Sequence, residues 1–291
     1  MNDDNELQYV INQNTTIKDS TKKQYINAYA RWTDTTDRQV IDSSEAYIIS
    51  VLDKMACSPN SKSVVISAIV LIRNYHELSV DKIRRWRDTK LKKRIDVAHT
   101  AKDKSDNELL PTYTELMDHV KKLYKDKNYK DYIINFILSK YCVRNRDLNV
   151  FITQDKSMLL QTDTNIIYLA PSYAIYQRND YKTHDTYGQI KINIRSMPFR
   201  NACLNFLDNN PDGYLFANSN EKVMADSSIG NYIQEHSFNQ LGEGRICKLV
   251  LGYYAKRGNI REITRISKSR GTNIQTLIDY YMPHLSADKK D

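Results

Sequence analysis

The chain of 291 residues contains few glycines and prolines, 8 and 6 respectively. These two residues form most tight turns, so their scarcity argues against a protein of many short strands and favours helices joined by short loops. Long apolar runs are also lacking. The longest run, 64–72, is interrupted by Ser67 and is too short to span a bilayer, so we expect no membrane segment.

Cysteine is scarce as well, and the 4 cysteines lie far apart in the sequence. No pair has the spacing of zinc ligands and no histidine cluster lies near them, which argues against a metal site and against a disulfide framework. The first residues, MNDDNELQYV, are acidic and polar, unlike a secretory signal. We therefore expect an intracellular protein in a reducing compartment.

Positive charge is plentiful. The chain has 43 Lys and Arg against 35 Asp and Glu, a formal net charge of +8 and a pI near 9.1. A basic protein suits a polyanion, because each neutralised phosphate releases condensed counterions. The alternative interpretation is a lysine-rich surface with no ligand.

The first hundred residues have the apolar spacing of helices. We predict four helices, near 17–32, 44–55, 60–72 and 79–98, that form a first domain over residues 1–98. The last helix is strongly basic, and up to Arg94 its acidic residues are only Asp81 and Asp88. We interpret it as a DNA-contacting surface, with a merely solvated face as the alternative. Its cations are Lys82, Arg84, Arg85, Arg87, Lys90, Lys92, Lys93 and Arg94.

The polar stretch 99–111 (HTAKDKSDNELLP) predicts a linker, and a second domain follows over residues 112–291. Helices are expected near 112–125 and 129–142. Short apolar or alternating runs at 165–169, 172–176 and 189–194 then predict strands, and the chain is again helical from Ser196 onward. The predicted fold class is mainly α with a small antiparallel β-sheet.

Several basic residues of this second domain stand at unusual places. Arg144 and Asp147 are three residues apart and would share a helix face, where the carboxylate can steady the guanidinium. Lys182 lies in the turn between two predicted strands. Arg245 begins an apolar helix, where its charge opposes the helix dipole and favours an anion nearby. Each of these residues taken alone is equally compatible with an ordinary surface charge.

Near its C-terminus the sequence has the pair Gly271-Thr272, followed by Tyr280 and Tyr281. The order of arginine, lysine in a β-turn, arginine on a helix, Gly-Thr and tyrosine resembles the tyrosine recombinase (phage integrase) family. The segment around Lys182 is similar to members from large DNA viruses and their mobile elements. The resemblance covers the second domain firmly, and the first domain is similar to the family's helical core-binding domain in layout only.

The resemblance implies a site-specific recombinase or integrase that breaks and rejoins DNA. Arg144 and Arg245 would hold the scissile phosphate, steadied by Asp147, and Lys182 would protonate the leaving 5′-oxygen. Tyr281 would attack phosphorus and form a 3′-phosphotyrosyl intermediate. The family needs no metal and no cofactor. Its members act on double-stranded DNA as tetramers on paired sites, which places this chain in the cytoplasm or nucleus of a host.

The chain departs from the family pattern at two positions. Gly242 stands where a histidine is usual, and Thr272 stands where a histidine or tryptophan is usual, although Thr272 can still donate a hydrogen bond. His236 or Lys268 could substitute for the missing histidine, and Tyr280 is the alternative nucleophile. Two other functions stay open: a DNA relaxing enzyme like type IB topoisomerases, and a catalytically degenerate DNA-binding relic.

Overall fold

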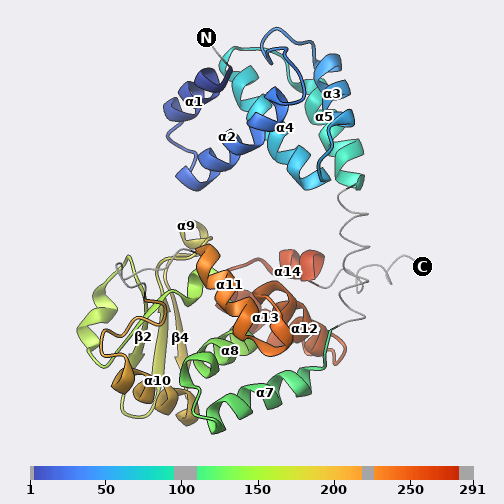
Figure 1. The fold of residues 1–291 in the computed structure, drawn as a ribbon. Coiled ribbons are helices and arrows are strands. Elements are labelled where there is room, and N and C mark those ends of the chain that lie inside the picture. The colour runs from blue at the N-terminus through green and yellow to red at the C-terminus, as the bar shows by residue number, and fades with distance from the viewer. Residues whose placement is uncertain (1–2, 95–109, 218–225, 282–291) are drawn as a thin grey trace. The chain divides into compact units, whose positions relative to one another are not determined.

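The structure is a computed structural model, and it describes residues 3–94, 110–217 and 226–281. The chain divides into two compact units, Met1–Ser105 and Asp106–Asp291 (Figure 1). This division falls within the stretch 99–111 that the sequence predicts as a linker. Residues 99–109 of that stretch lie outside the described residues.

The N-terminal unit is a bundle of helices (Figure 1). Serine side chains cap two of them, because Ser44 Oγ accepts a hydrogen bond from the Tyr47 N–H and Ser58 Oγ accepts one from the Ser61 N–H. Helix α4 packs against α1 and α2 and carries much of the buried apolar surface. The elements are α1 (Asp3–Gln13), α2 (Asp19–Thr33), α3 (Glu45–Lys54), α4 (Pro59–Tyr75), α5 (Asp81–Trp86) and the π-helical turn η1 (Arg87–Leu91).

Two features of this unit differ from the sequence prediction. Helix α1 was not expected, yet its residues Leu7, Val10 and Ile11 are buried at helical spacing. The helix predicted over 79–98 begins at Asp81 as α5 and continues as the π-helical turn η1. A π turn places residues five apart on one face, which lets Trp86 and Leu91 both be buried. Residues 95–98 lie outside the described residues.

The C-terminal unit begins with a capping box, in which Thr112 and Glu115 satisfy each other's backbone N–H groups. Its helices and 3-10 turns surround one small sheet. They are α7 (Tyr113–Lys125), α8 (Tyr129–Tyr141), η2 (Asn145–Leu148), η3 (Lys156–Leu160), α9 (His184–Tyr187), α10 (Met197–Asn209), α11 (Asp226–His236), η4 (Phe238–Gln240), α12 (Glu243–Ala255), α13 (Ile260–Arg270) and α14 (Ile274–Tyr281).

The sheet has four strands in the order β1-β2-β3-β4. The three strands expected from the sequence pair antiparallel, β2 with β3 and β3 with β4. A further strand, β1, precedes them and pairs with β2 in parallel, so the sheet is mixed. The parallel pairing is possible because η3 crosses between β1 and β2 and returns the chain to the same edge. The strands are β1 (Val150–Thr153), β2 (Asn165–Leu169), β3 (Ala174–Arg178) and β4 (Ile190–Ile194).

Helix α8 is the central element of this unit. Its residues from Asp131 to Ser139 are buried, and α7, α10, α12 and α13 all pack against it (Figure 1). The protein is therefore mainly helical with one small sheet, as the sequence predicts. None of the helices in the described ranges has the length and apolar content needed to cross a membrane. Because α8 is fixed in the core, the residues that follow it are also held in place.

Candidate active site

Arg144 lies just beyond the end of α8. Cys142 ends that helix in the left-handed conformation, with φ at 51°, and the chain then runs extended through Arg144 into η2. The Arg144 guanidinium donates hydrogen bonds to the Thr272 Oγ1 at 2.8 Å and to the Arg270 carbonyl at 3.2 Å. Arg144 is thus directed at the turn between α13 and α14, and it does not share a helix face with Asp147 as predicted.

Gly271 forms that turn. It ends α13 with φ at 62°, a conformation that favours glycine. A Cβ at this position would lie 2.7 Å from the Tyr181 ring, so any side chain here would also collide. Thr272 follows and is buried, with its hydroxyl bonded to Arg144 and its carbonyl accepting from Ser267 Oγ at 2.6 Å. Thr272, at the position where the resemblance predicts a histidine or tryptophan, therefore contacts Arg144 directly.

The turn that carries Lys182 packs against Gly271. Thr183 Oγ1 donates a hydrogen bond to the Gly271 carbonyl at 2.6 Å. Tyr181 is buried under Gly271 and donates its hydroxyl to the Gly188 carbonyl at 2.8 Å. Lys182 itself is exposed between these two anchored neighbours, in the connection from β3 to β4 where the sequence places it. The Lys182 turn, Thr272 and Arg144 therefore meet around Gly271.

A buried ion pair supports this arrangement. Asp147 Oδ2 accepts the Arg144 backbone N–H at 3.0 Å and the Arg178 Nη1 at 2.5 Å, and neither side chain of the Asp147–Arg178 pair is exposed. Arg178 also donates to the Ser269 carbonyl and lies 4.6 Å from the centre of the Tyr181 ring. Through these contacts Arg178 connects the chain segment that carries Arg144 with the segments that carry Lys182 and Gly271. The sequence analysis missed it, although an arginine ending an apolar strand was a visible signal.

Arg270 is a second buried arginine that the sequence analysis missed. It donates to the Cys142 carbonyl, and its Nη2 lies 3.7 Å from Glu243 Oε1 at the first turn of α12. Burial raises the pKa of Glu243, against the opposing effects of the Arg270 and Arg144 charges. Arg270 therefore links the end of α8 to the start of α12, the helix that carries Arg245.

Arg245 is the third residue of α12, and it is exposed. Gly242 is the N-cap of this helix, and a Cβ there would have no heavy atom within 4 Å. A Cβ at position 242 would therefore meet no steric obstacle. Packing does not force the glycine at this position.

The resemblance leaves His236 and Lys268 as candidates for the role of the histidine that Gly242 replaces. His236 Nδ1 is 3.3 Å from Asp131 Oδ2, in the first turn of α8, and its ring stacks on Tyr232. Asp131 and Cys142 are separated by about 16 Å along α8, at 1.5 Å per residue. Lys268 is exposed on α13 and lines a groove with β4 residues Ile190 to Asn193. His236 therefore lies near the end of α8 opposite to the end that Arg144 follows.

The candidate nucleophiles lie in α14, which begins two residues after Thr272. This helix packs against α12 and α13, and its Leu277 is fully buried. The backbone of Tyr280 and Tyr281 belongs to α14, while their side chains lie outside what the structure describes. The choice between the two tyrosines stays a prediction.

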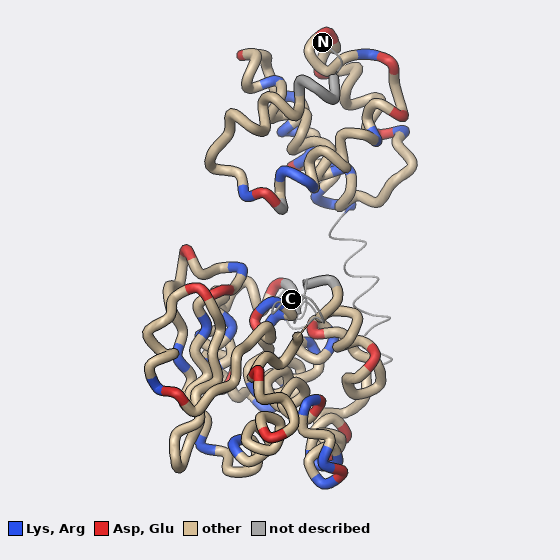
Figure 2. The backbone as a smooth tube through the Cα atoms, turned by 60° about the vertical axis from the view of Figure 1, so that its left-hand side comes forward, with Lys and Arg blue, Asp and Glu red and all other residues tan. Residues whose placement is uncertain are grey.

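The basic segment of the N-terminal unit presents its charges to solvent. Ile83, Trp86 and Leu91 are buried, whereas Arg87 is half-buried and the other cations from Lys82 to Arg94 are exposed. Figure 2 shows these cations as blue stretches just before the thin grey trace begins. Arg94 pairs with Asp53 at 2.7 Å and Arg87 with Asp88 at 2.9 Å. Residues 82–94 thus form one solvent-facing cationic surface.

The described side chains include no group of three His, Cys, Asp or Glu residues that could hold a metal ion.

No protein-family model matches the chain, and no curated protein matches it in sequence. Among solved structures, the chain is similar to the crystal structure of XerA recombinase, with 13% identity, 99% of each chain covered and a TM-score of 0.39. A TM-score of this size is too low to bear on activity, so function depends on the site itself.

Proposed function

We propose that this chain breaks and rejoins double-stranded DNA through a covalent tyrosine intermediate. One observation carries the proposal: Arg144 and Thr272, 128 positions apart in the sequence, are joined by a side-chain hydrogen bond at 2.8 Å. The Lys182 turn is bonded to the same Gly271-Thr272 segment through Thr183. An arginine and an exposed lysine on one rigid frame suit a phosphodiester, because positioning and charge can stabilise its transition state without a metal.

In this proposal each residue has one role. The planar guanidinium of Arg144, together with Arg245, holds the non-bridging oxygens of the scissile phosphate. The Tyr281 hydroxyl loses its proton to solvent and its oxygen forms a bond to phosphorus as the bond to the 5′-oxygen breaks. Lys182 donates the proton that the departing 5′-oxygen takes. The 3′-phosphotyrosyl link conserves the bond energy, so that a 5′-hydroxyl can reverse the step and rejoin the strand.

The two units have separate tasks in this proposal. The cationic surface 82–94 tracks the phosphates of the duplex, while residues 112–291 carry the chemistry. Paired DNA sites hold a tetramer, in the cytoplasm or nucleus of a host cell. Strand exchange between the sites is then integration or excision of a mobile element.

Trapping the covalent intermediate tests the proposal. On a duplex with a nick beside the cleavage site, the short 5′-product diffuses away and the protein stays bound to DNA. We expect a covalent adduct with the natural chain and none with Tyr281→Phe, because the attacking oxygen is removed. Tyr280→Phe is the matched control and keeps the adduct. An adduct that survives in Tyr281→Phe and is lost in Tyr280→Phe assigns the nucleophile to Tyr280.

A second candidate function is DNA binding without cleavage. The glycine at position 242 favours it, because the histidine that the resemblance predicts there is absent and cannot accept the proton of the attacking tyrosine. Duplex binding with no adduct from the natural chain would support this function over the first. Relaxation of supercoiled plasmid by a monomer, without site preference, would instead identify a topoisomerase-like enzyme.

A further inference from the structure

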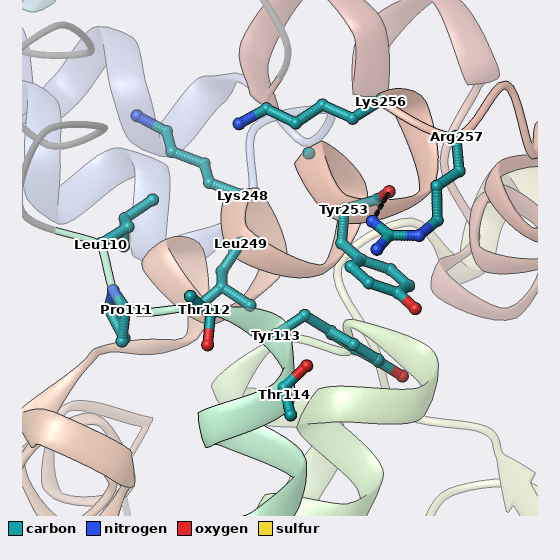
Figure 3. Close-up of a pocket in the computed structure, with 11 residues that line it drawn as sticks. Leu110, Pro111, Thr112, Tyr113, Thr114, Lys248, Leu249, Tyr253, Lys256 and Arg257 are labelled. Carbon is teal, nitrogen blue, oxygen red and sulfur yellow. Dashed lines mark hydrogen bonds between the residues drawn. The ribbon is translucent and has the colours of Figure 1, made fainter.

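A cationic pocket lies between the start of α7 and the outer face of α12 (Figure 3). Its volume is about 580 Å³. In the described part of the chain its lining contains the cations Lys248, Lys256 and Arg257 and no carboxylate. Figure 3 shows the Lys248 and Lys256 side chains extending on the same side of the pocket. The remaining lining residues are Leu110, Pro111, Thr112, Tyr113, Thr114, Leu249, Gly252 and Tyr253. This charge excess suits an anion.

One wall of the pocket is aromatic and already ordered. The Tyr113 ring stacks on Tyr253 with centroids 4.1 Å apart, and the Arg257 guanidinium lies 3.8 Å from the Tyr253 centroid. Arg257 also donates to the Tyr253 carbonyl at 3.4 Å (Figure 3). Stacking on Tyr253 fixes the orientation of the Arg257 fork, so less side-chain entropy is lost when an anion binds.

Gly252 lines the pocket from the last turn of α12. Glycine inside a helix costs about 1 kcal/mol relative to alanine. A Cβ at Gly252 would have no heavy atom within 4 Å, so packing within this chain does not require glycine there. The missing side chain leaves the pocket open, which a ligand that approaches the helix backbone would require.

The pocket lies on the same face of α12 as Arg245. Residues 245, 249, 252 and 256 fall on one side of a helix with 3.6 residues per turn. Arg245 and Lys256 are separated by about 16 Å along the axis, at 1.5 Å per residue. This length corresponds to about five base pairs of duplex DNA, at 3.4 Å of axial rise for each phosphate of a strand. The cations of α12 thus have the spacing of a contact with DNA several base pairs long.

We propose that the α7–α12 pocket binds backbone phosphates of duplex DNA near the cleavage site, with Lys248 and Lys256 each on its own phosphate, so that Arg245, Lys248 and Lys256 form one row of phosphate contacts. The inference rests on the proposed function, because it takes Arg245 as the catalytic end of the row. Contacts of this kind fix the register of the protein on the duplex and carry no sequence information. An acidic protein segment is the competing ligand, and measuring the binding of both duplex DNA and an acidic peptide distinguishes it from DNA.

The test is the salt dependence of duplex binding, measured by fluorescence anisotropy of a labelled DNA with the full chain. The double variant Lys248→Gln with Lys256→Gln should lower the slope of log affinity against log salt by about 1.8, at about 0.9 for each lost phosphate contact. Gly252→Glu should weaken binding in the same direction, because it puts a carboxylate into the pocket. The matched control is Lys122→Gln with Lys125→Gln, two exposed lysines of α7 that do not line the pocket and carry the same charge change.

The inference is supported if the slope of log affinity against log salt falls in the pocket variants and stays within about 0.3 of the natural value in the control. Equal losses in both pairs, or no loss in either, overturn it. A third outcome also overturns the inference: a polyglutamate peptide binds the natural chain and does not bind the pocket variants, while the pocket variants bind duplex DNA as the natural chain does. The covalent adduct is scored separately: an adduct with an unchanged slope rejects only the pocket, whereas a reduced slope without any adduct rejects only the proposed cleavage.

Discussion

Arginine and lysine serve opposite purposes in two regions of this protein, the segment 82–94 and the candidate site. In the N-terminal unit, the cationic side chains of residues 82–94 face solvent, while Ile83, Trp86 and Leu91 of the same segment are buried. In the C-terminal unit, Arg178 and Arg270 are 0% and 1% exposed, and both bond to backbone carbonyls near Gly271 and Arg144. Exposed cations remain available to a polyanion, while buried cations lose their hydration and need oxygen partners within the fold. The buried arginines Arg178 and Arg270 therefore hold the candidate site together from within the fold, whereas the cations of residues 82–94 stay accessible from solvent.

The largest effect that tests this comparison is expected from Arg178→Met. Removing the guanidinium leaves the Asp147 carboxylate buried without its ion-pair partner, which costs about 3–5 kcal/mol. The chain has 2 tryptophans, Trp32 and Trp86, both in the N-terminal unit. In urea, far-UV circular dichroism reports on both units, whereas tryptophan fluorescence reports on the first. We expect the dichroism transition to move to lower urea and the fluorescence transition to stay in place.

The control for Arg178→Met is the double variant with Asp147→Asn. It removes the buried charge together with its partner, so part of the lost stability should return. A fluorescence transition that moves as far as the dichroism transition would show that the two units unfold together. The contrast between the units would then not extend to their stability.

Replacing exposed cations of residues 82–94 should change stability less than Arg178→Met does. The same replacement should weaken DNA binding strongly. Changing Arg84, Arg85 and Lys93 to glutamine should alter the free energy of unfolding by less than about 0.5 kcal/mol, because exposed charges contribute little. The slope of log DNA affinity against log salt should fall by as much as about 2.7, at about 0.9 for each contact.

The matched set for this experiment is Lys23, Arg31 and Lys54, which are also exposed in the N-terminal unit. Changing them to glutamine removes the same charge from outside residues 82–94. Equal slopes for the two sets would mean that DNA responds to net charge alone, and residues 82–94 would lose their assigned role.

The smallest effect is expected from Glu243→Gln. Burial raises the pKa of Glu243 above its ordinary value of 4.5, so the folded state holds this proton more tightly than the unfolded state. The stability that Glu243 contributes is therefore present below that ordinary value and is lost as pH rises through the raised pKa. Urea unfolding between about pH 4 and about pH 7 should show the natural chain losing stability relative to the variant. A difference that grows with pH in the opposite sense would mean that the Arg270 and Arg144 charges outweigh burial.

Much of the local structure could be predicted from the sequence. Ser44 begins α3 and Thr112 begins α7 because their hydroxyls accept a backbone N–H at a helix start. Strand β1 and the left-handed Cys142 were not predicted. Cys142 has no preference for positive φ, and the surrounding fold holds it in that conformation.

The candidate site was predicted as a set of residue types in order, and the positions of Lys182 and Gly271 in turns follow from local signals. The supporting arginines could not be predicted. Arg178 and Asp147 are 31 residues apart, and nothing in the local spacing of either residue indicates the other. The sequence also suggested that Asp147 would lie on one helix face with Arg144, whereas in the structure it holds the Arg144 backbone N–H.

The sequence by itself determined the mainly helical fold class, the starts of several helices and the turn at Gly271, because capping, periodicity and positive φ depend on neighbouring residues. Only the tertiary structure decided which cations are buried and which face solvent. Burial depends on what packs around a side chain from distant segments, such as the Gly271-Thr272 turn against Arg144. For the same reason, only the fold brought Arg144, Thr272 and the Lys182 turn together around a single glycine.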